Sequence, residues 1–389
     1  MSQPEVYQEI QTYLGDFIGP WVSKWTLDRL TVLVSGILKG QAASPARIAQ
    51  ASQGLNERGV QAESLERRVR RIENDPKLQA STCFAPLVKA QLAQAHPRQL
   101  WLILDPSLQE DRVVLVSLNA WYRGRSLPLV WTIWPANQPL EGDRFWQRVA
   151  ELLEQAAQLL PAGVRITVLA DRAFGTPAFT DRVAAQGWHW IVRVQGQTHY
   201  RDRCGRESSL AELVHQAGQR WKGSGLVFKK AGWRPASVVV YWGRRYRSPL
   251  CLVSDQPAEW ELIGEYRRRF SIEPSFRDWK SYGWQWEQGQ VTCLEHVQRL
   301  LVGMAVATWL TVLVGAHQAY ALLIQPPSPQ RQTRPWWGKR SLFRLGLELW
   351  AQCFAEGLPP WLRACLPDWD APNWSRQITA HSVHAFIFA

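Results

Sequence analysis

The apolar residues in the first part of the chain follow a helical spacing. The run 30–38 is apolar, and Leu65, Val69 and Ile72 recur at i, i+4 and i+7, which places them on one face of a helix. The other faces of that helix carry arginines at Arg67, Arg68, Arg70 and Arg71. Short helices with an arginine-rich last member suit a DNA-binding module, and a solvated helix pair explains the pattern equally well. We expect residues 1–98 to form a helical N-terminal DNA-binding region.

Residues 99–195 change to a strand-rich pattern. Apolar runs suited to strands occupy 100–104, 113–118, 127–134, 164–170 and 190–194, and helical spacing returns at 145–160 and 177–185. The first and fourth of these runs end at Asp105 and Asp171. The alternation predicts an α/β core in which two acidic residues follow strands.

The alternation stops in residues 196–258. This segment has short β-rich runs, several tryptophans and basic clusters at Lys229, Lys230, Arg244, Arg245 and Arg247. Helical spacing resumes in 259–324, and a linker rich in proline and glutamine precedes a last helical segment. We therefore predict a core made of 99–195 and 259–324, a β-rich insertion at 196–258, and a linker with a C-terminal helical segment at 325–389.

One stretch requires a membrane test. Residues 300–316 are uncharged over seventeen positions, which is the lower limit of length for a spanning helix. No positive cluster follows the stretch to set an orientation. A buried core helix is the favoured interpretation, and a basic protein anchored in a membrane is the alternative.

Composition narrows the class of partner. Lys+Arg number 45 against 33 Asp+Glu, which gives a net charge of +12, and 46% of the residues are hydrophobic. A basic chain with enough apolar residues for a core favours a polyanionic partner, nucleic acid before an anionic membrane surface. The six cysteines contain no CxxC pair and show no metal-ligand spacing with the eight histidines. They indicate a reducing compartment and argue against structural zinc.

The most informative stretch is EYRRRFSIEPSFRDWK. It has the spacing Tyr-x2-Arg-x3-Glu-x6-Lys, formed by Tyr266, Arg269, Glu273 and Lys280. On a regular helix these four side chains fall within an arc of about 60°. Pro274 would kink a continuous helix. The alternative is a new helix capped by Ser271 with Pro274 in its first turn.

This spacing resembles the Tyr-Arg-Glu-Lys motif of the DDE transposases of bacterial insertion sequences, in the IS-four superfamily. In this resemblance Asp105 corresponds to the first catalytic aspartate, Asp171 to the second and Glu273 to the third carboxylate. The resemblance implies an α/β fold with an RNase H-like catalytic core and a β-rich insertion. It also implies an enzyme that binds element ends, cleaves DNA and joins 3′-hydroxyls to target DNA.

The chemistry of such a site follows from its charges. Three converging carboxylates repel one another and call for divalent cations, and hard oxygen ligands suit two ions of Mg²⁺ or Mn²⁺. Arg269 would clamp a phosphate, Tyr266 would donate a hydrogen bond to one, and Lys280 would hold a neighbouring phosphate.

Two tryptophans of the insertion are candidates for base stacking. In relatives an aromatic residue of the insertion stacks a base that is flipped out of the duplex. Trp233 and Trp242 are the candidates here, and a core position is the alternative for each.

Further expectations concern partners and location. We expect terminal inverted repeats and target DNA as partners, a homodimer on paired ends, no membrane contact, and a cytoplasmic, nucleoid-associated protein. The alternative function is a domesticated relative that binds DNA without catalysis.

Overall fold

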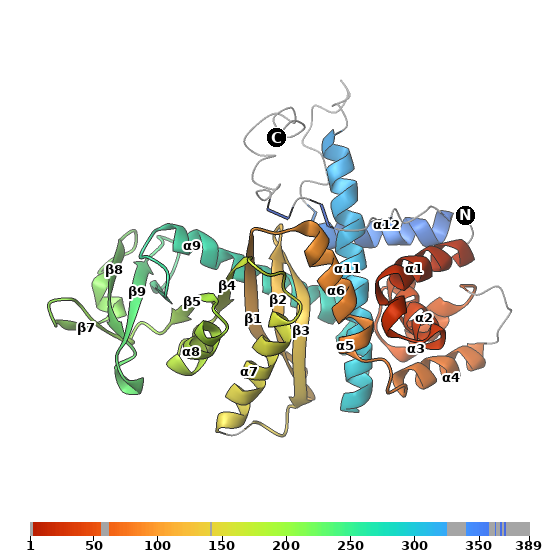
Figure 1. Ribbon diagram of the computed structural model, residues 1–389, viewed down its shortest axis with the longest axis horizontal. Helices are drawn as coiled ribbons and strands as arrows, with labels where there is room; N and C mark the ends of the chain where they lie inside the picture. The colour runs from red at the N-terminus through yellow and green to blue at the C-terminus, as the bar shows by residue number, and fades with distance from the viewer. Residues whose placement is uncertain are drawn as a thin grey trace.

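The computed structural model describes residues 3–55, 62–140, 142–324 and 340–357, together with 362, 366–367 and 369–370. Within them the chain forms one large mixed sheet with helices on its faces and at one end (Figure 1). The predicted α/β class is confirmed. The predicted linker at the start of 325–389 lies outside the described residues.

The sheet contains the strands β1 (Gln99–Gln109), β2 (Val113–Tyr122), β3 (Arg125–Pro135), β4 (Arg165–Ala170), β5 (His189–Val194), β6 (His199–Arg201), β7 (Glu207–Ser209), β8 (Arg220–Val227), β9 (Arg234–Tyr241) and β10 (Leu250–Ser254). Their order is β3-β2-β1-β4-β5-β10-β9-β8-β6-β7. β4 pairs in parallel with both β1 and β5, whereas β1, β2 and β3 form an antiparallel meander. The parallel strands therefore lie side by side in the middle of the sheet.

The segment 196–258 extends this sheet. β10 pairs antiparallel with β5 and continues through β9 to β8 and β6. These strands lie at the opposite end of the molecule from the N-terminal helices (Figure 1). The backbone hydrogen bonds of core and insertion thus belong to one ladder. Our division of the chain into separate domains stays a prediction.

The α-helices are α1 (Gln3–Ile18), α2 (Lys24–Gly40), α3 (Pro45–Ser52), α4 (Ala62–Glu73), α5 (Ala80–Cys83), α6 (Ala85–Ala95), α7 (Asp143–Ala157), α8 (Pro177–Ala185), α9 (Glu261–Tyr266), α10 (Ile272–Arg277), α11 (Leu294–Ile324) and α12 (Leu342–Glu356). The residues that predicted the α4 helix, Leu65, Val69 and Ile72, are buried. Arg67, Arg70 and Arg71 are exposed on its other faces. The described N-terminal elements are therefore helical before β1.

The long apolar helix α11 lies between the N-terminal helices and the sheet, and it packs against α2, α12 and β3 (Figure 1). Among the described residues it is the one helix whose length and composition would allow it to cross a membrane. However, 94% of its most apolar window is buried inside the fold. That burial is what a core helix requires.

Glycines allow the closest helix contact. A Cβ on Gly315 of α11 would overlap the backbone carbonyl of Leu342, and a Cβ on Gly346 of α12 would overlap the carbonyl of Thr311. Any larger residue at either position would push the two helix backbones apart. These two glycines therefore set the distance at which α12 closes the core.

Candidate active site

Asp105 and Asp171 lie next to each other at the point where two parallel strands separate. The last registered pair between β1 and β4 is Leu104 with Ala170, so the next residue on each chain is an aspartate. The prediction that the first strand ends at Asp105 is wrong, because β1 continues to Gln109 through its pairing with β2. What ends after Leu104 is the parallel pairing, since β4 stops at Ala170.

The two-residue period of the strands sets the direction of these side chains. Ile103 and Leu169 belong to the small apolar cluster on the face that α9 and α10 cover. Residues two positions further along a strand point to the same face. Asp105 follows Ile103 at this spacing, and Asp171 follows Leu169, since Asp171 keeps an extended backbone. Both carboxylates therefore face the helical segment that carries Glu273.

That helical segment changes its pitch three times. The α-helix α9 is followed by the 3₁₀ segment η5 (Arg267–Ser271), then by α10, and then by the π-helical turn η6 (Asp278–Tyr282). The prediction of one regular helix is wrong here. The alternative of a helix starting after Ser271 with Pro274 in its first turn is confirmed, although the Ser271 side chain makes no capping hydrogen bond. Pro274 is tolerated because first-turn N–H groups need no partner within the helix.

Arg269 brings the three predicted carboxylates together. Its guanidinium lies 2.7 Å from Oδ1 of Asp105, 3.8 Å from Oδ2 of Asp171 and 3.3 Å from Oε1 of Glu273. The Arg269 side chain is only 8% exposed, whereas that of Glu273 is 59% exposed. One buried cation thus contacts all three carboxylates, and the site opens to solvent on the side of Glu273.

Burial dominates the electrostatics of Asp105. It raises the pKa of this carboxyl above its ordinary value, while the charge and hydrogen bond of Arg269 act in the opposite direction. The negative charges of Asp171 and Glu273 add to the increase in pKa. Without a positive charge between them, three carboxylates at this spacing would favour protonation of one.

A second arginine of the site was missed from the sequence. Nη1 of Arg193, on β5, lies 3.9 Å from Oδ1 of Asp171. Arg193 follows Ile191 at the same two-residue spacing and therefore faces the same side of the sheet. The available signal was a single arginine inside the apolar run 190–194, because a charge in a buried strand requires a partner.

Tyr266 points inward. It is fully buried, and its hydroxyl has no hydrogen-bond partner among the described residues. Burial raises the pKa of this phenol. Its ring contacts Phe270 edge-on with 6.0 Å between centroids, and Phe270 is 43% exposed. Tyr266 therefore packs between the helical segment and the sheet, and its hydroxyl is still available as a hydrogen-bond donor.

Lys280 is held beside β1. Its Nζ donates to the backbone carbonyl of Leu108, three residues beyond Asp105, and lies 3.6 Å from Oε1 of Glu287. Its position in the π-helical turn η6 shifts it from the regular arc that the motif predicted. The structure thus brings Asp105, Asp171, Glu273 and Arg269 into one cluster and anchors Lys280 to the strand that carries Asp105.

The two candidate tryptophans have different surroundings. Trp233 is half-buried, with the guanidinium of Arg201 at 4.3 Å and Nζ of Lys229 at 6.0 Å from its ring centroid. Trp242 packs against the main core and donates its indole N–H to the carbonyl of Tyr246 at 2.9 Å. Trp233 therefore lies beside two basic side chains, whereas the indole N–H of Trp242 is already bound within the insertion.

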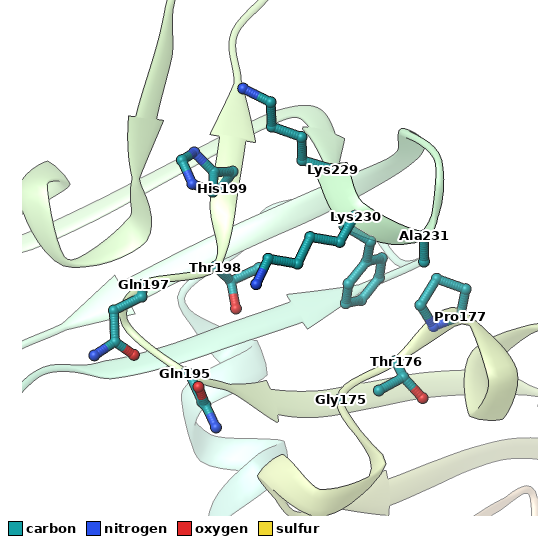
Figure 2. Close-up of a pocket in the computed structure, with 11 residues that line it drawn as sticks. Gly175, Thr176, Pro177, Gln195, Gln197, Thr198, His199, Lys229, Lys230 and Ala231 are labelled. Atoms are coloured by element: carbon teal, nitrogen blue, oxygen red, sulfur yellow. The ribbon is translucent and has the colours of Figure 1, made fainter. Parts of the chain in front are cut away.

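A pocket of about 270 Å³ lies between the core and the insertion (Figure 2). Its walls come from the loop that follows Asp171, from residues 195–199 after β5, and from residues 228–231. Figure 2 shows Lys230 reaching across the pocket towards Thr198, whereas Lys229 points away. Lys229 pairs with Glu207 at 2.6 Å, while Lys230 forms no ion pair with a described residue.

The candidate donor set for a metal ion consists of carboxylate oxygens. The three carboxylates supply hard oxygen ligands of the type that Mg²⁺ and Mn²⁺ prefer, and Oδ1 of Asp171 is buried without a hydrogen bond from a described residue. These ligands fit such an ion. As the side chains stand, however, no group of three or more His, Cys, Asp or Glu in the described ranges is arranged to hold one. Arg269 lies between the ligands instead.

A known protein family matches part of the chain. The family model of the transposase DDE domain matches residues 136–310. This match supports a DDE transposase, with transposition and DNA recombination as the process it serves. Asp171 and Glu273 lie inside the matched range, and Asp105 precedes it. No curated protein sequence matches the chain.

Solved structures add no argument of their own. A piggyBac transposase synaptic complex with hairpin DNA gives a TM-score of 0.47 at 10% identity, over 96% of this chain and 81% of that chain. The structure of human ENDOV gives a TM-score of 0.27 at 12% identity, over 49% of this chain and 93% of that one. Both values lie below what would carry a functional inference.

Proposed function

We propose that the protein is a DNA transposase whose active site is formed by Asp105, Asp171 and Glu273. It cleaves DNA strands at the ends of its element and transfers 3′-hydroxyls to target DNA. The observation that carries the proposal is the contact of all three carboxylates with one buried guanidinium, in a chain that matches a transposase DDE domain. The RNase H-like description of the core belongs to the same proposal.

The proposed cofactor is Mg²⁺ or Mn²⁺, as two ions held by Asp105, Asp171 and Glu273. Such ions supply activation of water or of a 3′-hydroxyl and stabilise the leaving oxygen. The chain itself supplies the oxygen ligands on a rigid base, because Asp105 lies on β1 and Asp171 directly follows β4, the parallel neighbour of β1. Glu273 comes from a helix that packs against β1 and β3.

Three further residues are proposed to position DNA. Arg269 offers a planar fork that suits a phosphate, and Lys280 holds a point charge beside the first aspartate. Tyr266 has an unused hydroxyl beneath the site. Their contribution would be orientation of the cleaved strand, since correct placement of the reacting phosphate lowers the barrier.

The insertion is proposed as the main DNA-contacting surface. Arg244, Arg245 and Arg247 are exposed, and none forms an ion pair with a described residue. Lys230 faces the pocket of Figure 2, where an ammonium and neighbouring hydroxyls suit a nucleotide of the end strand. Trp233 is the preferred candidate for base stacking, and Trp242 the second.

The remaining expectations are part of this proposal. The exposed arginines of α4 would contact DNA outside the active site, and two copies would bind paired inverted repeats. The protein would act in the cytoplasm at the nucleoid. A domesticated, inactive relative is the alternative, and the intact set of carboxylates around Arg269 favours the active enzyme.

The test is Mg²⁺-dependent cleavage of DNA that carries the inverted repeats flanking the coding frame. Asp105→Asn, Asp171→Asn and Glu273→Gln should each abolish cleavage and leave DNA binding largely intact, since backbone contacts dominate affinity. Glu261→Gln, an exposed carboxylate of α9, is the matched control and should cleave like the parent. If one of the three site variants also cleaves like the parent, that residue is not part of the active site.

A further inference from the structure

Arg269 contacts the same oxygen atoms that a metal ion would need. It lies 2.7 Å from Oδ1 of Asp105 and 3.3 Å from Oε1 of Glu273, and its own side chain is only 8% exposed. A divalent ion bound by these carboxylates would sit about 2.1 Å from their oxygens. The guanidinium and the ion would then be close neighbours of like charge in a poorly solvated site, where such repulsion is strong.

The contacts of Arg269 are few enough to be exchanged. Both Nη atoms bind carboxylates, but Nε has no hydrogen-bond partner among the described residues. The contact with Asp171 is long, at 3.8 Å. A DNA phosphate offers the guanidinium two oxygens in a bidentate arrangement. The side chain therefore has a second anionic partner whenever DNA is present.

We propose that Arg269 is an internal counter-cation that occupies the carboxylate site of the DNA-free protein and competes there with divalent metal. Engagement of a DNA phosphate draws Arg269 away from Asp105, Asp171 and Glu273 and frees their oxygens for the ion. Because linkage is reciprocal, bound metal must also strengthen the grip of Arg269 on DNA. The inference rests on the proposed function and sets the order of binding at that site, because metal binds tightly only after DNA.

The first test is Mn²⁺ binding to the full-length protein without DNA, measured by electron paramagnetic resonance. Arg269→Gln should bind Mn²⁺ more tightly than the parent, by about tenfold or more. Arg267→Gln is the matched control, because Arg267 is exposed on the same 3₁₀ segment, and it should bind like the parent. Asp105→Asn added to Arg269→Gln should remove the gain. An Arg269→Gln variant that binds no more tightly than Arg267→Gln overturns the proposal.

The second test uses the parent with a short DNA duplex. Its Mn²⁺ affinity should rise on addition of duplex. The ions that the duplex itself binds are measured with the Asp105→Asn protein and subtracted. Arg269→Gln should show no such rise. An equal rise in both proteins overturns the proposal. If Arg269→Gln does not fold, the measurement on the parent still tests the proposal, because a parent whose Mn²⁺ affinity does not rise with duplex also overturns it.

Failure of this inference differs from failure of the proposed function. Mn²⁺ binding that Asp105→Asn removes, but that Arg269→Gln leaves unchanged, refutes the counter-cation and keeps the metal site. Binding that Asp105→Asn leaves unchanged in every background refutes the metal site itself, and the counter-cation with it.

Discussion

Arg125 and Asp278 form a largely buried ion pair that holds the helical segment of the candidate site against the sheet. Nη1 of Arg125, at the start of β3, lies 2.9 Å from Oδ2 of Asp278, and the two side chains are only 14% and 17% exposed. Asp278 begins the π-helical turn that follows α10. Burial raises the pKa of Asp278 to about 6, although Arg125, Arg277 and Arg344 all favour its charged form.

This pKa sets the magnitude expected for Arg125→Met. Without Arg125 the pKa of Asp278 rises further, so the carboxyl becomes protonated in the folded state at neutral pH. The loss of folding free energy in Arg125→Met is then limited to the free energy of protonating Asp278 at the working pH, a step that the parent does not need. One pH unit above a pKa of about 6 corresponds to about 1.4 kcal/mol, and two units to about 2.7 kcal/mol. These values lie below the general cost of breaking a buried pair, about 3–5 kcal/mol.

The sign of the pH dependence follows from linkage. When folding raises the pKa of a carboxyl, the folded protein loses stability as the pH rises from the unfolded-state pKa to the folded-state pKa. The parent stops losing stability above about pH 6, where Asp278 is already ionised, whereas Arg125→Met continues to lose it. The difference in melting temperature between the two proteins should therefore be small at about pH 5 and grow steadily to about pH 8.

Thermal unfolding followed across that pH range is the measurement. In an Asp278→Asn background the effect of Arg125→Met should no longer depend on pH, because the titrating group is gone. A difference that stays constant from low to high pH in the presence of Asp278 would show that Arg125 acts through packing alone. The reasoning from charge would then be wrong.

Three further predictions follow from the contacts. Gly346→Ala should lower the melting temperature, because its Cβ would overlap the carbonyl of Thr311; an unchanged value would mean that α11 and α12 separate freely. Neutralising the exposed arginines 244, 245 and 247 should flatten the salt dependence of DNA binding by about one unit of slope per lost phosphate contact, and an unchanged slope would mean that they only solvate the surface. Arg269→Lys keeps the charge but loses the fork, so single-turnover cleavage of pre-bound DNA should be slowed; parent-like cleavage would refute the clamp role.

Much of the site could be predicted from local sequence. Arg269 and Glu273 stand four residues apart, and helical backbone brings such a pair together whatever the rest of the fold does. Asp105 and Asp171 each follow an apolar run, and an acidic residue directly after such a run can be recognised in the sequence alone. The fold class follows from the same alternation of strand and helix spacing.

The features that could not be predicted depend on pairing between distant segments. β1 continues beyond Asp105 because β2 pairs with it there, and hydrophobicity says nothing about where a partner strand stops. The insertion extends the core sheet through the pairing of β10 with β5, although its sequence indicates only short strands. The change of pitch after Tyr266 likewise follows from packing, because the fully buried tyrosine fixes one end of a segment that must also carry Pro274.

The role of Arg269 depends both on local sequence and on the pairing of distant segments. Its residue type and spacing indicate a phosphate ligand, and that interpretation considers the protein only with DNA present. In the absence of DNA a buried guanidinium needs an anion, and three clustered carboxylates need a cation. The sheet register brings Asp105 and Asp171 to the face where Arg269 stands, so each side satisfies the other. In our proposal the same residue therefore stabilises the free protein and, because its charge opposes metal, makes metal binding by the carboxylates depend on DNA.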